Sequence, residues 1–289
     1  MKEFVILTES TCDLPPEMAE EMDIKVLRLH VLLEGQDYEN YLDGRELPFK
    51  ALYDSMRAKK LPSTSQVIFS DFLKEMEPVL ESGKDILYIG FSGTMSGTLS
   101  SGKVAAEELL KKYPQRRIEC IDSLSASMGE GLLVYLCAKK KEEGASLDEV
   151  LAYGKDCVAH MPHLFTVNDL MHVMRSGRAT KSSAIIGSVL GMKPVMNVNM
   201  DGLMDKLMVV RGRKAAMKKM VEMTAKNIQD KTLPIFIGHG DCLEDAEKLR
   251  DMLKAELSVE KMYINYIGAV CGCHAGPDVL AVFYYGKNR

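Results

Sequence analysis

The sequence predicts an α/β fold made of two lobes, and three observations support this. Short apolar, β-branched runs alternate with helical patterns through the first half of the chain, as in a parallel sheet with helices on both faces. The pattern changes near Met161 and Pro162, after which strands follow one another more closely. A length of 289 residues suits two lobes. We therefore expect an N-terminal α/β lobe over residues 1–160 and a C-terminal α/β lobe with a mixed sheet over residues 161–289.

The first lobe is predicted to contain four strands, because four apolar segments are short and rich in β-branched residues. They are Phe4–Leu7, Ile24–Leu33, Ile86–Ile89 and Arg117–Asp122. Helices are expected at Pro16–Met22, Pro48–Lys59, Phe69–Glu81, Thr98–Tyr113, Met128–Glu143 and Leu147–Ala159. Glu34–Asp37 is read as a turn and Leu61–Gln66 as a loop. Ligands of such sheets bind at the carboxyl ends of the strands.

The second lobe is predicted to hold a mixed or antiparallel sheet covered by helices. Its strands are expected at Phe165–Val167, Pro194–Val198, Leu207–Val210, Ile235–Ile237, Met262–Ile267 and Val279–Tyr285. Asp201-Gly202 is a strong signal for a hairpin between two of them. Helices are expected at Ser182–Leu190, Lys214–Asn227 and Leu243–Leu257.

Composition and charge argue against several classes of protein. The formal net charge of -4 supplies no positive field for nucleic acid, and the basic residues near 211–219 have the spacing of a solvated helix face. No apolar run approaches the ~18 residues of a membrane span, and the N-terminus does not resemble a secretory signal. Seven scattered cysteines do not form a disulfide framework. We expect a cytoplasmic protein that binds no nucleic acid.

Metal binding is not expected either. The segment Cys271–His274 reads Cys-x-Cys-His, which lacks the two-residue spacing of zinc knuckles, and no second pair lies elsewhere in the sequence.

Three loops at the expected carboxyl ends of first-lobe strands are rich in hydroxyl groups and glycine. They are Thr8–Thr11, Ser92–Thr98 and Ser123–Ser127. Loops that precede helices present free backbone N–H groups, and the helix dipole favours an anion there. Each loop alone is equally well explained as an ordinary N-cap. Because three of them converge on one sheet edge, we favour an anion-binding site.

An enzyme acting at the cleft between the lobes is the competing hypothesis. Gly97–Lys103 matches the first seven positions of a P-loop, but Val104 replaces the hydroxyl residue that would hold magnesium. Gly90–Gly93 is one position short of the nucleophile elbow of ester hydrolases. A nucleotide- or ester-hydrolysing enzyme would use Ser96 or His274 as nucleophile or base.

Taken in order along the whole chain, seven motifs resemble those of the DegV family of fatty-acid-binding proteins. They are Thr8–Leu14, Pro62–Gln66, Met95–Thr98, Asp122-Ser123 with Met128–Gly131, Val173–Arg178, Lys193-Pro194 and His274–Asp278. The sequence departs from the family pattern at Glu9, Ser176 and Asp278.

The resemblance implies a two-lobed α/β fold with the ligand between the lobes. It implies that the hydroxyls of Thr64 and Ser96 and the backbone N–H of Gly97 bind a fatty acid carboxylate, with Arg178 and His274 close to the head group. The ligand would be a long-chain fatty acid of about C16–C18, whose tail leaves water at about 0.8 kcal/mol per methylene. No other cofactor is implied.

The resemblance also implies that the protein is not itself an enzyme. Chemistry belongs to a separate fatty acid kinase, whose catalytic subunit is the implied partner and which phosphorylates the bound fatty acid in phospholipid metabolism. Transient contact with a membrane stays open.

The tail of the ligand needs an apolar pocket, for which the sequence offers the segment Ala184–Met192. It is apolar on nearly all sides, so we assign Ile185, Ile186, Val189 and Leu190 to the acyl pocket. A helix buried in the core of the second lobe would show the same pattern.

Overall fold

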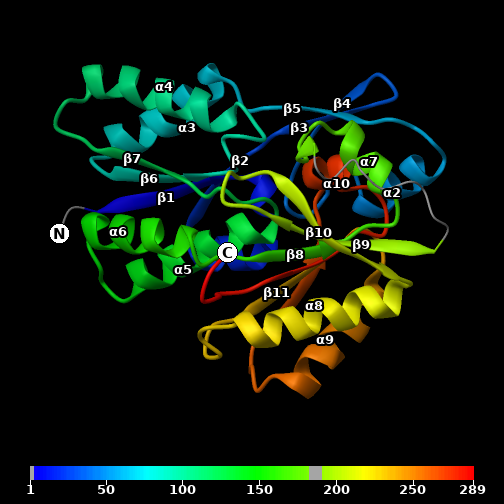
Figure 1. Ribbon diagram of the computed structural model, residues 1–289. Helices are drawn as coiled ribbons and strands as arrows, with labels where there is room; N and C mark the ends of the chain where they lie inside the picture. Colours follow the sequence, from blue (N-terminus) through cyan, green and yellow to red (C-terminus); the bar gives the residue numbers. More distant parts are fainter. Residues whose placement is uncertain (1–2, 182–190) are drawn as a thin grey trace.

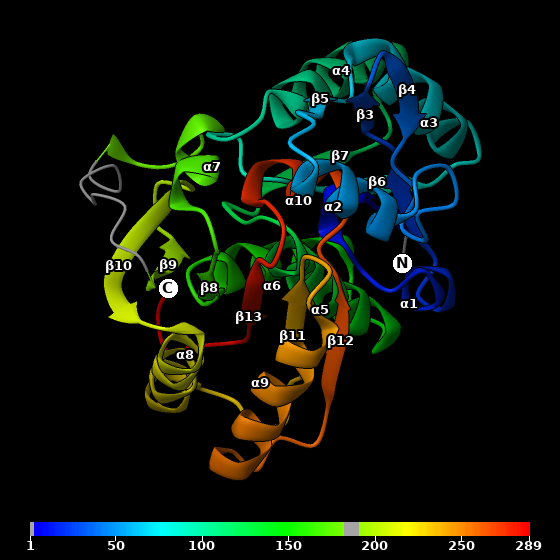
Figure 2. The ribbon, with the colours of Figure 1, turned by 90° about the vertical axis from the view of Figure 1, so that its right-hand side faces the viewer.

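The computed structural model describes residues 3–181 and 191–289, and the described strands form three sheets (Figures 1 and 2). Sheet A has the order β2 (Ile24–Leu27), β1 (Phe4–Glu9), β6 (Asp85–Gly90) and β7 (Ile118–Asp122), all parallel. Two helices, α3 (Phe69–Glu81) and α4 (Thr98–Lys112), cover one face. The other face carries α5 (Met128–Glu142) and α6 (Leu147–Val158), and α1 (Pro16–Glu21) packs beside β2. The predicted parallel sheet with helices on both faces is confirmed.

Sheet C is the mixed sheet predicted for the second half of the chain. Its order is β10 (Met204–Arg211), β9 (Met192–Val198), β8 (His163–Thr166), β13 (Leu280–Phe283), β11 (Ile235–His239) and β12 (Met262–Tyr266). Only the β11–β12 pair within it is parallel. Asp201 and Gly202 join β9 to β10 as an antiparallel hairpin, as predicted. The outer face is covered by α8 (Arg213–Asn227) and α9 (Leu243–Glu256) (Figure 1).

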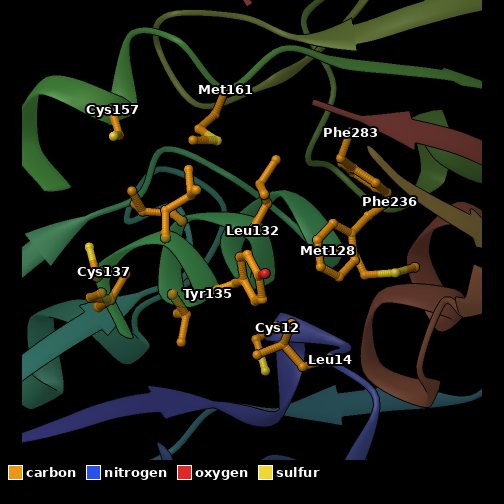
Figure 3. Packing of buried hydrophobic residues seen from close by; sticks show 14 of the residues in the cluster. Cys12, Leu14, Met128, Leu132, Tyr135, Cys137, Cys157, Met161, Phe236 and Phe283 are labelled. Carbon is orange, nitrogen blue, oxygen red and sulfur yellow. The ribbon is translucent and has the colours of Figure 1, made fainter. Parts of the chain in front are cut away.

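Helix α5 lies between sheets A and C and ties them into one core. Every residue from Met128 to Ala138 is buried, as expected of a helix that is apolar all round. Figure 3 shows Leu132 and Tyr135 of this helix with Phe236 of sheet C on one side and Leu14 on the other. Because α5 packs against strands of both halves, the boundary near residue 160 stays a prediction.

The prediction of one continuous strand over Ile24–Leu33 is wrong, because the chain leaves sheet A after Leu27. The backbone N–H of Leu29 donates to Ser10 Oγ at 3.1 Å, and its carbonyl accepts from the N–H of Asn40 at 2.7 Å. The second part becomes β3 (His30–Leu33) of sheet B, which pairs antiparallel with β4 (Gln36–Glu39) and β5 (Ser63–Ser65). The predicted loop Leu61–Gln66 therefore contains a strand.

Two short helices of the second half were not predicted, α7 (Leu170–Arg175) and α10 (Ala269–Ala275). Each is too short to show a clear helical period in the sequence. Helix α10 packs against α7, against α2 (Phe49–Arg57) and against sheet B, which brings distant parts of the chain together. The predicted helix Ser182–Leu190 lies outside the described residues.

Candidate functional site

A cavity of about 440 Å³ lies where the carboxyl end of sheet A faces sheet C. The strand order β2-β1-β6-β7 places β1 beside β6, with the following connections running to opposite sides. Ligands of open α/β sheets bind at such a switch point, outside the carboxyl ends of the strands. The loops after β1, β6 and β7 contribute Thr11, Phe91, Ser96 and Ser127 to the cavity wall.

The five residues predicted to surround a carboxylate all line this cavity: Thr64, Ser96, Gly97, Arg178 and His274. They come from β5, from the loop before α4, from the segment after α7 and from the last turn of α10. Thr64 contacts His274, Arg178 lies near His274, and Gly97 lies beside Gln66. Together with Ser96 these groups form a polar region of the cavity wall.

Thr64 and His274 are in direct contact, with Thr64 Oγ1 2.9 Å from His274 Nε2. Pairing of β5 with β3 fixes Thr64 opposite Val31, and α10 packs over both strands. Burial, together with the nearby Arg178 and His172, lowers the pKa of His274 to about 4. At neutral pH the imidazole is therefore uncharged and donates through only one of its nitrogens.

Ser96 and Gly97 lie at the N-terminus of α4, where the helix dipole favours an anion. Ser96 Oγ lies 3.0 Å from Thr98 Oγ1 and accepts from the N–H of Thr98, the first residue of α4, at 3.3 Å. A Cβ atom on Gly97 would lie 2.3 Å from Gln66 Oε1, so a side chain there would displace the end of Gln66. Gly97 lines the cavity, and without a side chain its backbone is not shielded from it.

Arg178 supplies a guanidinium group to the cavity without a carboxylate partner among the described residues. Its Nη1 donates to the carbonyl of Ser176, and its backbone carbonyl accepts from the N–H of Met204 at 3.0 Å. The first contact holds the side chain and the second holds its backbone. Within residues 3–181 and 191–289 no carboxylate balances the charge, which favours an anionic group nearby.

The remaining wall of the cavity is mainly apolar. Its apolar residues are Leu29, Phe91, Met95, Ala126, Phe165, Val198, Met204, Ile267, Val270, Ala275, Val279, Ala281 and Phe283. The predicted acyl-pocket residues Ile185, Ile186, Val189 and Leu190 lie outside the described residues.

Sheet C provides several wall residues that sequence reasoning missed, although a signal existed. Val279, Ala281 and Phe283 of one run face the cavity, while the alternate residues Leu280 and Val282 pack beneath α8 and α9. Successive side chains of a strand point to opposite faces, so a strand apolar at every position must be covered on both sides.

Buried acids behind the cavity wall were also missed. Burial raises the pKa of Glu9 to about 7 and that of Asp13 to about 7, and raises the pKa of Glu130 well above its usual range. The cavity residues Thr11 and Ser127 donate from their hydroxyls to Glu130 and Asp13 respectively.

Hydrogen counting supports a protonated Glu130. Thr8 Oγ1 lies 2.8 Å from the carbonyl of Ile89 and 2.9 Å from Glu130 Oε1. One hydroxyl has a single proton, and a carbonyl can only accept. When Thr8 donates to Ile89, Glu130 donates its own proton to Thr8. Lone acids inside apolar runs, such as Glu130 after Met128, are the signal that could have found this cluster.

The segment that imitates a P-loop does not form a phosphate cradle. Gly102 and Lys103 lie inside α4, as the sequence indicated, and Gly102 packs against the rings of Phe72 and Tyr88. Within residues 3–181 and 191–289, no three His, Cys, Asp or Glu side chains are grouped to hold a metal ion. None of the helices in that part of the chain is long and apolar enough to cross a membrane.

Comparison with known proteins gives consistent matches over the whole chain. A family model described as an uncharacterised protein of the DegV family matches residues 3–287. A DegV domain-containing protein of Clostridium perfringens is 40% identical over 290 residues, covering 100% of this chain and 99% of the relative.

Two solved structures are similar in fold. One, described as showing fatty acid binding of a DegV family protein from Thermus thermophilus, has a TM-score of 0.88 and 28% identity, covering 99% of this chain and 100% of that one. The other, DegV from Bacillus subtilis, described as a fatty acid binding protein, has a TM-score of 0.85 and 25% identity, with coverage of 99% and 100%.

Proposed function

Because the chain belongs to the DegV family, we propose that it binds one long-chain fatty acid in the cavity and presents the carboxylate to a partner fatty acid kinase. The observation that carries this proposal is that Thr64, Ser96, Gly97, Arg178 and His274 all line one cavity whose remaining wall is mainly apolar. The structures from Thermus thermophilus and Bacillus subtilis, described as fatty acid binding, support it.

The apolar wall accounts for affinity. Burial of a methylene is worth about 0.8 kcal/mol, so a tail of ~16 carbons gains on the order of 10 kcal/mol before the entropy costs of binding. The long-chain class, about C16–C18, follows from this need for a large apolar term rather than from the dimensions of the cavity.

The polar region offsets the free-energy cost of burying the carboxylate of the ligand. Without partners, such a group would cost several kcal/mol, a penalty that hydrogen bonds from the hydroxyls of Thr64 and Ser96 and from the N–H of Gly97 offset. If His274 carries its proton on Nε2, it donates to Thr64 Oγ1 and leaves the Thr64 proton free for the carboxylate. In this tautomer the neutral imidazole orients Thr64 as a donor.

Presentation to a kinase requires that the head-group site bind the carboxylate only weakly. Neutral donors leave a carboxylate nucleophilic, whereas a bidentate arginine clamp would hold it more firmly. Arg178 adds positive charge, but its Nη1 is already engaged with the Ser176 carbonyl. We therefore assign phosphoryl transfer to the partner and no hydrolytic activity to this chain.

The setting is proposed to be the cytoplasm, with any membrane contact transient. All seven cysteines are free, which supports a reducing compartment.

Equilibrium binding to delipidated protein tests the proposal. A fluorescent long-chain fatty acid should bind at one site per chain and be displaced by unlabelled palmitate. Addition of a fatty acid kinase and ATP should then yield acyl phosphate only in the presence of this protein. Saturable binding without any kinase-dependent product would contradict the proposed kinase partner. Absence of binding would contradict the proposed fatty acid ligand.

A further inference from the structure

Two cross-links join the same two segments of the chain, 57–64 and 274–278. At one end, Thr64 Oγ1 lies 2.9 Å from His274 Nε2. At the other end, Arg57 Nη2 donates to Asp278 Oδ1 at 2.9 Å. The first pair belongs to the proposed head-group site, and the second lies outside it.

Asp278 uses all of its polar groups in this position. Its N–H donates to the carbonyl of Gly240 at 2.7 Å, and its own carbonyl accepts from Arg213 Nη2 at 2.8 Å. Its second carboxylate oxygen accepts from Asn168 Nδ2 at 2.7 Å. The backbone of Asp278 has a φ of 63°, a left-handed conformation that residues other than glycine rarely adopt. Four contacts thus hold one aspartate in a costly conformation.

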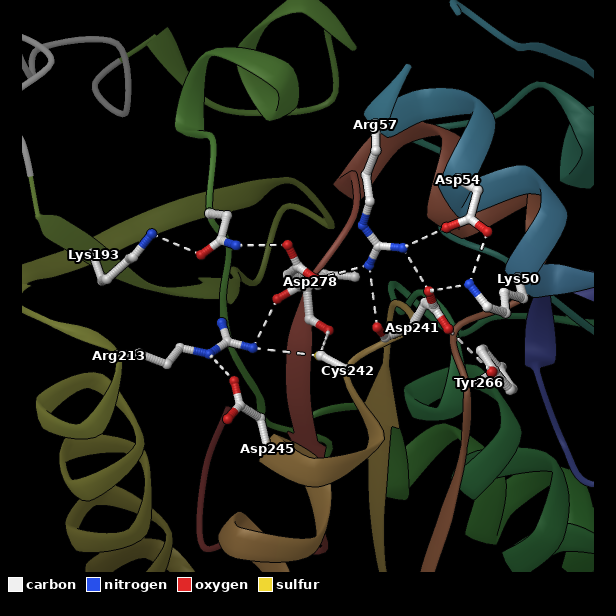
Figure 4. A network of polar contacts seen from close by, with 12 residues as sticks. Lys50, Asp54, Arg57, Lys193, Arg213, Asp241, Cys242, Asp245, Tyr266 and Asp278 are labelled. Carbon is white, nitrogen blue, oxygen red and sulfur yellow. Dashed lines mark hydrogen bonds and ion pairs between the residues drawn. The ribbon is translucent and has the colours of Figure 1, made fainter. Parts of the chain in front are cut away.

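Arg57 is surrounded in a similar way, and Figure 4 shows its guanidinium between Asp54, Asp241 and Asp278. Nη1 lies 3.1 Å from Asp54 Oδ1 and 2.5 Å from Asp241 Oδ2. Deeper in the same helix, Tyr53 donates to the carbonyl of Ile267 at 2.7 Å, just before α10 begins. Helix α2 is therefore fixed to the α10 region both inside and at the surface.

A second cavity of about 330 Å³ borders both segments beside the Arg57–Asp278 link. Its wall includes Lys59, Lys60 and Leu61 of one segment and Gly276 and Pro277 of the other, with residues from Asn168 to Arg175 completing it. Ala275 borders both this cavity and the larger one. Pairing with β3 sets the register of Thr64, and because a cavity borders residues 59–61, the link at the far ends of the two segments is a further restraint on how closely Thr64 approaches His274.

We propose that Arg57 and Asp278 are positioning residues for the head-group site, holding segment 57–64 against segment 274–278 so that Thr64 and His274 stay in contact. The role is distinct from binding, since neither side chain lines the larger cavity. The proposal deepens the proposed function and rests on it for its effect on fatty acid binding, although its effect on His274 can be measured without ligand.

A purely stabilising role is the alternative. The side chains of Arg57 and Asp278 are 35% and 34% exposed, and pairs so exposed contribute little to stability on their own. The two roles therefore differ in where the effect of a substitution appears: in global stability, or in the environment of His274.

The experiment measures the imidazole nitrogens of His274 by NMR in delipidated, full-length protein, assigned by their loss in His274→Gln. The variants are Asp278→Gly, which accepts the left-handed conformation, and Arg57→Gln. Asp54→Asn is the matched control, because it removes another carboxylate beside Arg57 without touching the segment 274–278. Thermal unfolding of each variant is followed in parallel, and the release rate of a fluorescent fatty acid is measured by stopped flow.

In wild-type protein His274 should titrate near a pKa of about 4, with burial as the main cause and Arg178 and His172 as facing charges. In Asp278→Gly and Arg57→Gln we expect this pKa to rise toward 6.5, as water reaches the ring. Release of the fatty acid should be faster by on the order of tenfold, equivalent to about 1.4 kcal/mol. Asp54→Asn should have the His274 pKa and the release rate of wild type. Arg57→Lys, which keeps a positive charge, should lie between wild type and Arg57→Gln in both measurements.

Unchanged His274 titration and release in both folded variants would overturn the proposal, whatever their unfolding temperatures. Should Asp278→Gly not fold, Arg57→Gln and Asp278→Asn decide the matter with the same readouts. If wild-type protein binds no fatty acid, the proposed function fails, but the titration of His274 still tests the positioning role.

Discussion

The side chains of Thr64 and His274 meet at 2.9 Å although the residues are 210 positions apart in the chain. The contact joins the edge of sheet B to the last turn of α10, at the polar region of a cavity whose remaining wall is mainly apolar. Such a pairing suits an amphipathic ligand with one charged end.

Removal of the Thr64 hydroxyl should weaken fatty acid binding without abolishing it. Thr64→Val keeps the shape of the side chain and loses one hydrogen bond to a charged group, at a cost of about 1–3 kcal/mol, or roughly 5- to 150-fold in affinity. The apolar term of the tail remains. Titration with a fluorescent fatty acid measures the change, and Thr64→Ser is the control that keeps the hydroxyl.

Ser96→Ala should weaken binding by a similar amount and also lower stability. Ser96 Oγ accepts from the N–H of Thr98, so its loss removes one hydrogen bond at the start of α4, worth about 0.5–1.5 kcal/mol. Denaturant unfolding separates this from the loss of affinity. The proposed carboxylate site is wrong if Thr64→Val and Ser96→Ala both bind with wild-type affinity.

Substitution of Arg178 or His274 should affect phosphoryl transfer more than binding. Arg178→Gln removes unbalanced positive charge beside the head group, and His274→Ala frees Thr64 from its partner. We expect the rate of acyl-phosphate formation by the kinase to fall at saturating protein, with a smaller change in fatty acid affinity. Equal losses in both measurements would make these residues simple binding groups.

A larger side chain in the apolar part of the cavity wall should lower the affinity for long fatty acids more than for short ones. Ala281 lies on β13 in the cavity wall and is 2% exposed. Ala281→Leu adds side-chain volume there, so a tail of ~16 carbons should bind more weakly while one of ~10 carbons is less affected, because each excluded methylene forfeits about 0.8 kcal/mol. Competition between the two acids on wild type and variant gives the ratio. An unchanged ratio would place the tail elsewhere.

Asp13 should make stability depend on pH in a defined direction. Burial raises its pKa from 3.8 to about 7, so the carboxyl contributes stability that is full below about pH 4 and is lost as pH rises through about 7. The buried His239 has a lowered pKa, near 4, and acts in the opposite direction, so only a difference between variants is diagnostic. Relative to wild type, Asp13→Asn should gain stability between pH 5 and pH 8, on the order of a few kcal/mol.

Urea unfolding of delipidated protein at the two pH values measures this difference. A stability difference between wild type and Asp13→Asn that is the same at both pH values would show that Asp13 is ionised across the range.

Much of the fold could be predicted because strands and long helices carry periodic signals. The run Ile86–Ile89 and the helix Met128–Glu143 appear nearly where the sequence placed them. The break at Leu29 could not be predicted, since it depends on hydrogen bonds to Ser10 and Asn40, which are distant in the sequence. Local pattern does not encode which sheet a strand joins.

Part of the candidate site could likewise be predicted from the sequence, and part could not. Hydroxyl and glycine content marked the loops that carry Ser96 and Gly97, because helix N-termini and turns select those residue types. The buried acids escaped notice because charged residues are read as exposed unless a partner is known. The pairing of Glu130 with Thr8 and Thr11 appears only when α5 is placed beside β1.

Native mass spectrometry of protein purified from a bacterial host, without added lipid, shows whether the chain carries a fatty acid. We expect one additional mass per chain, which organic extraction should release and identify as a fatty acid of about C16–C18, since only a long tail supplies the required apolar term. Thr64→Val, which only weakens the head-group contact, should carry less of it. Repeated preparations that contain the bare chain, or a stoichiometric ligand that is not an acyl species, would contradict the account.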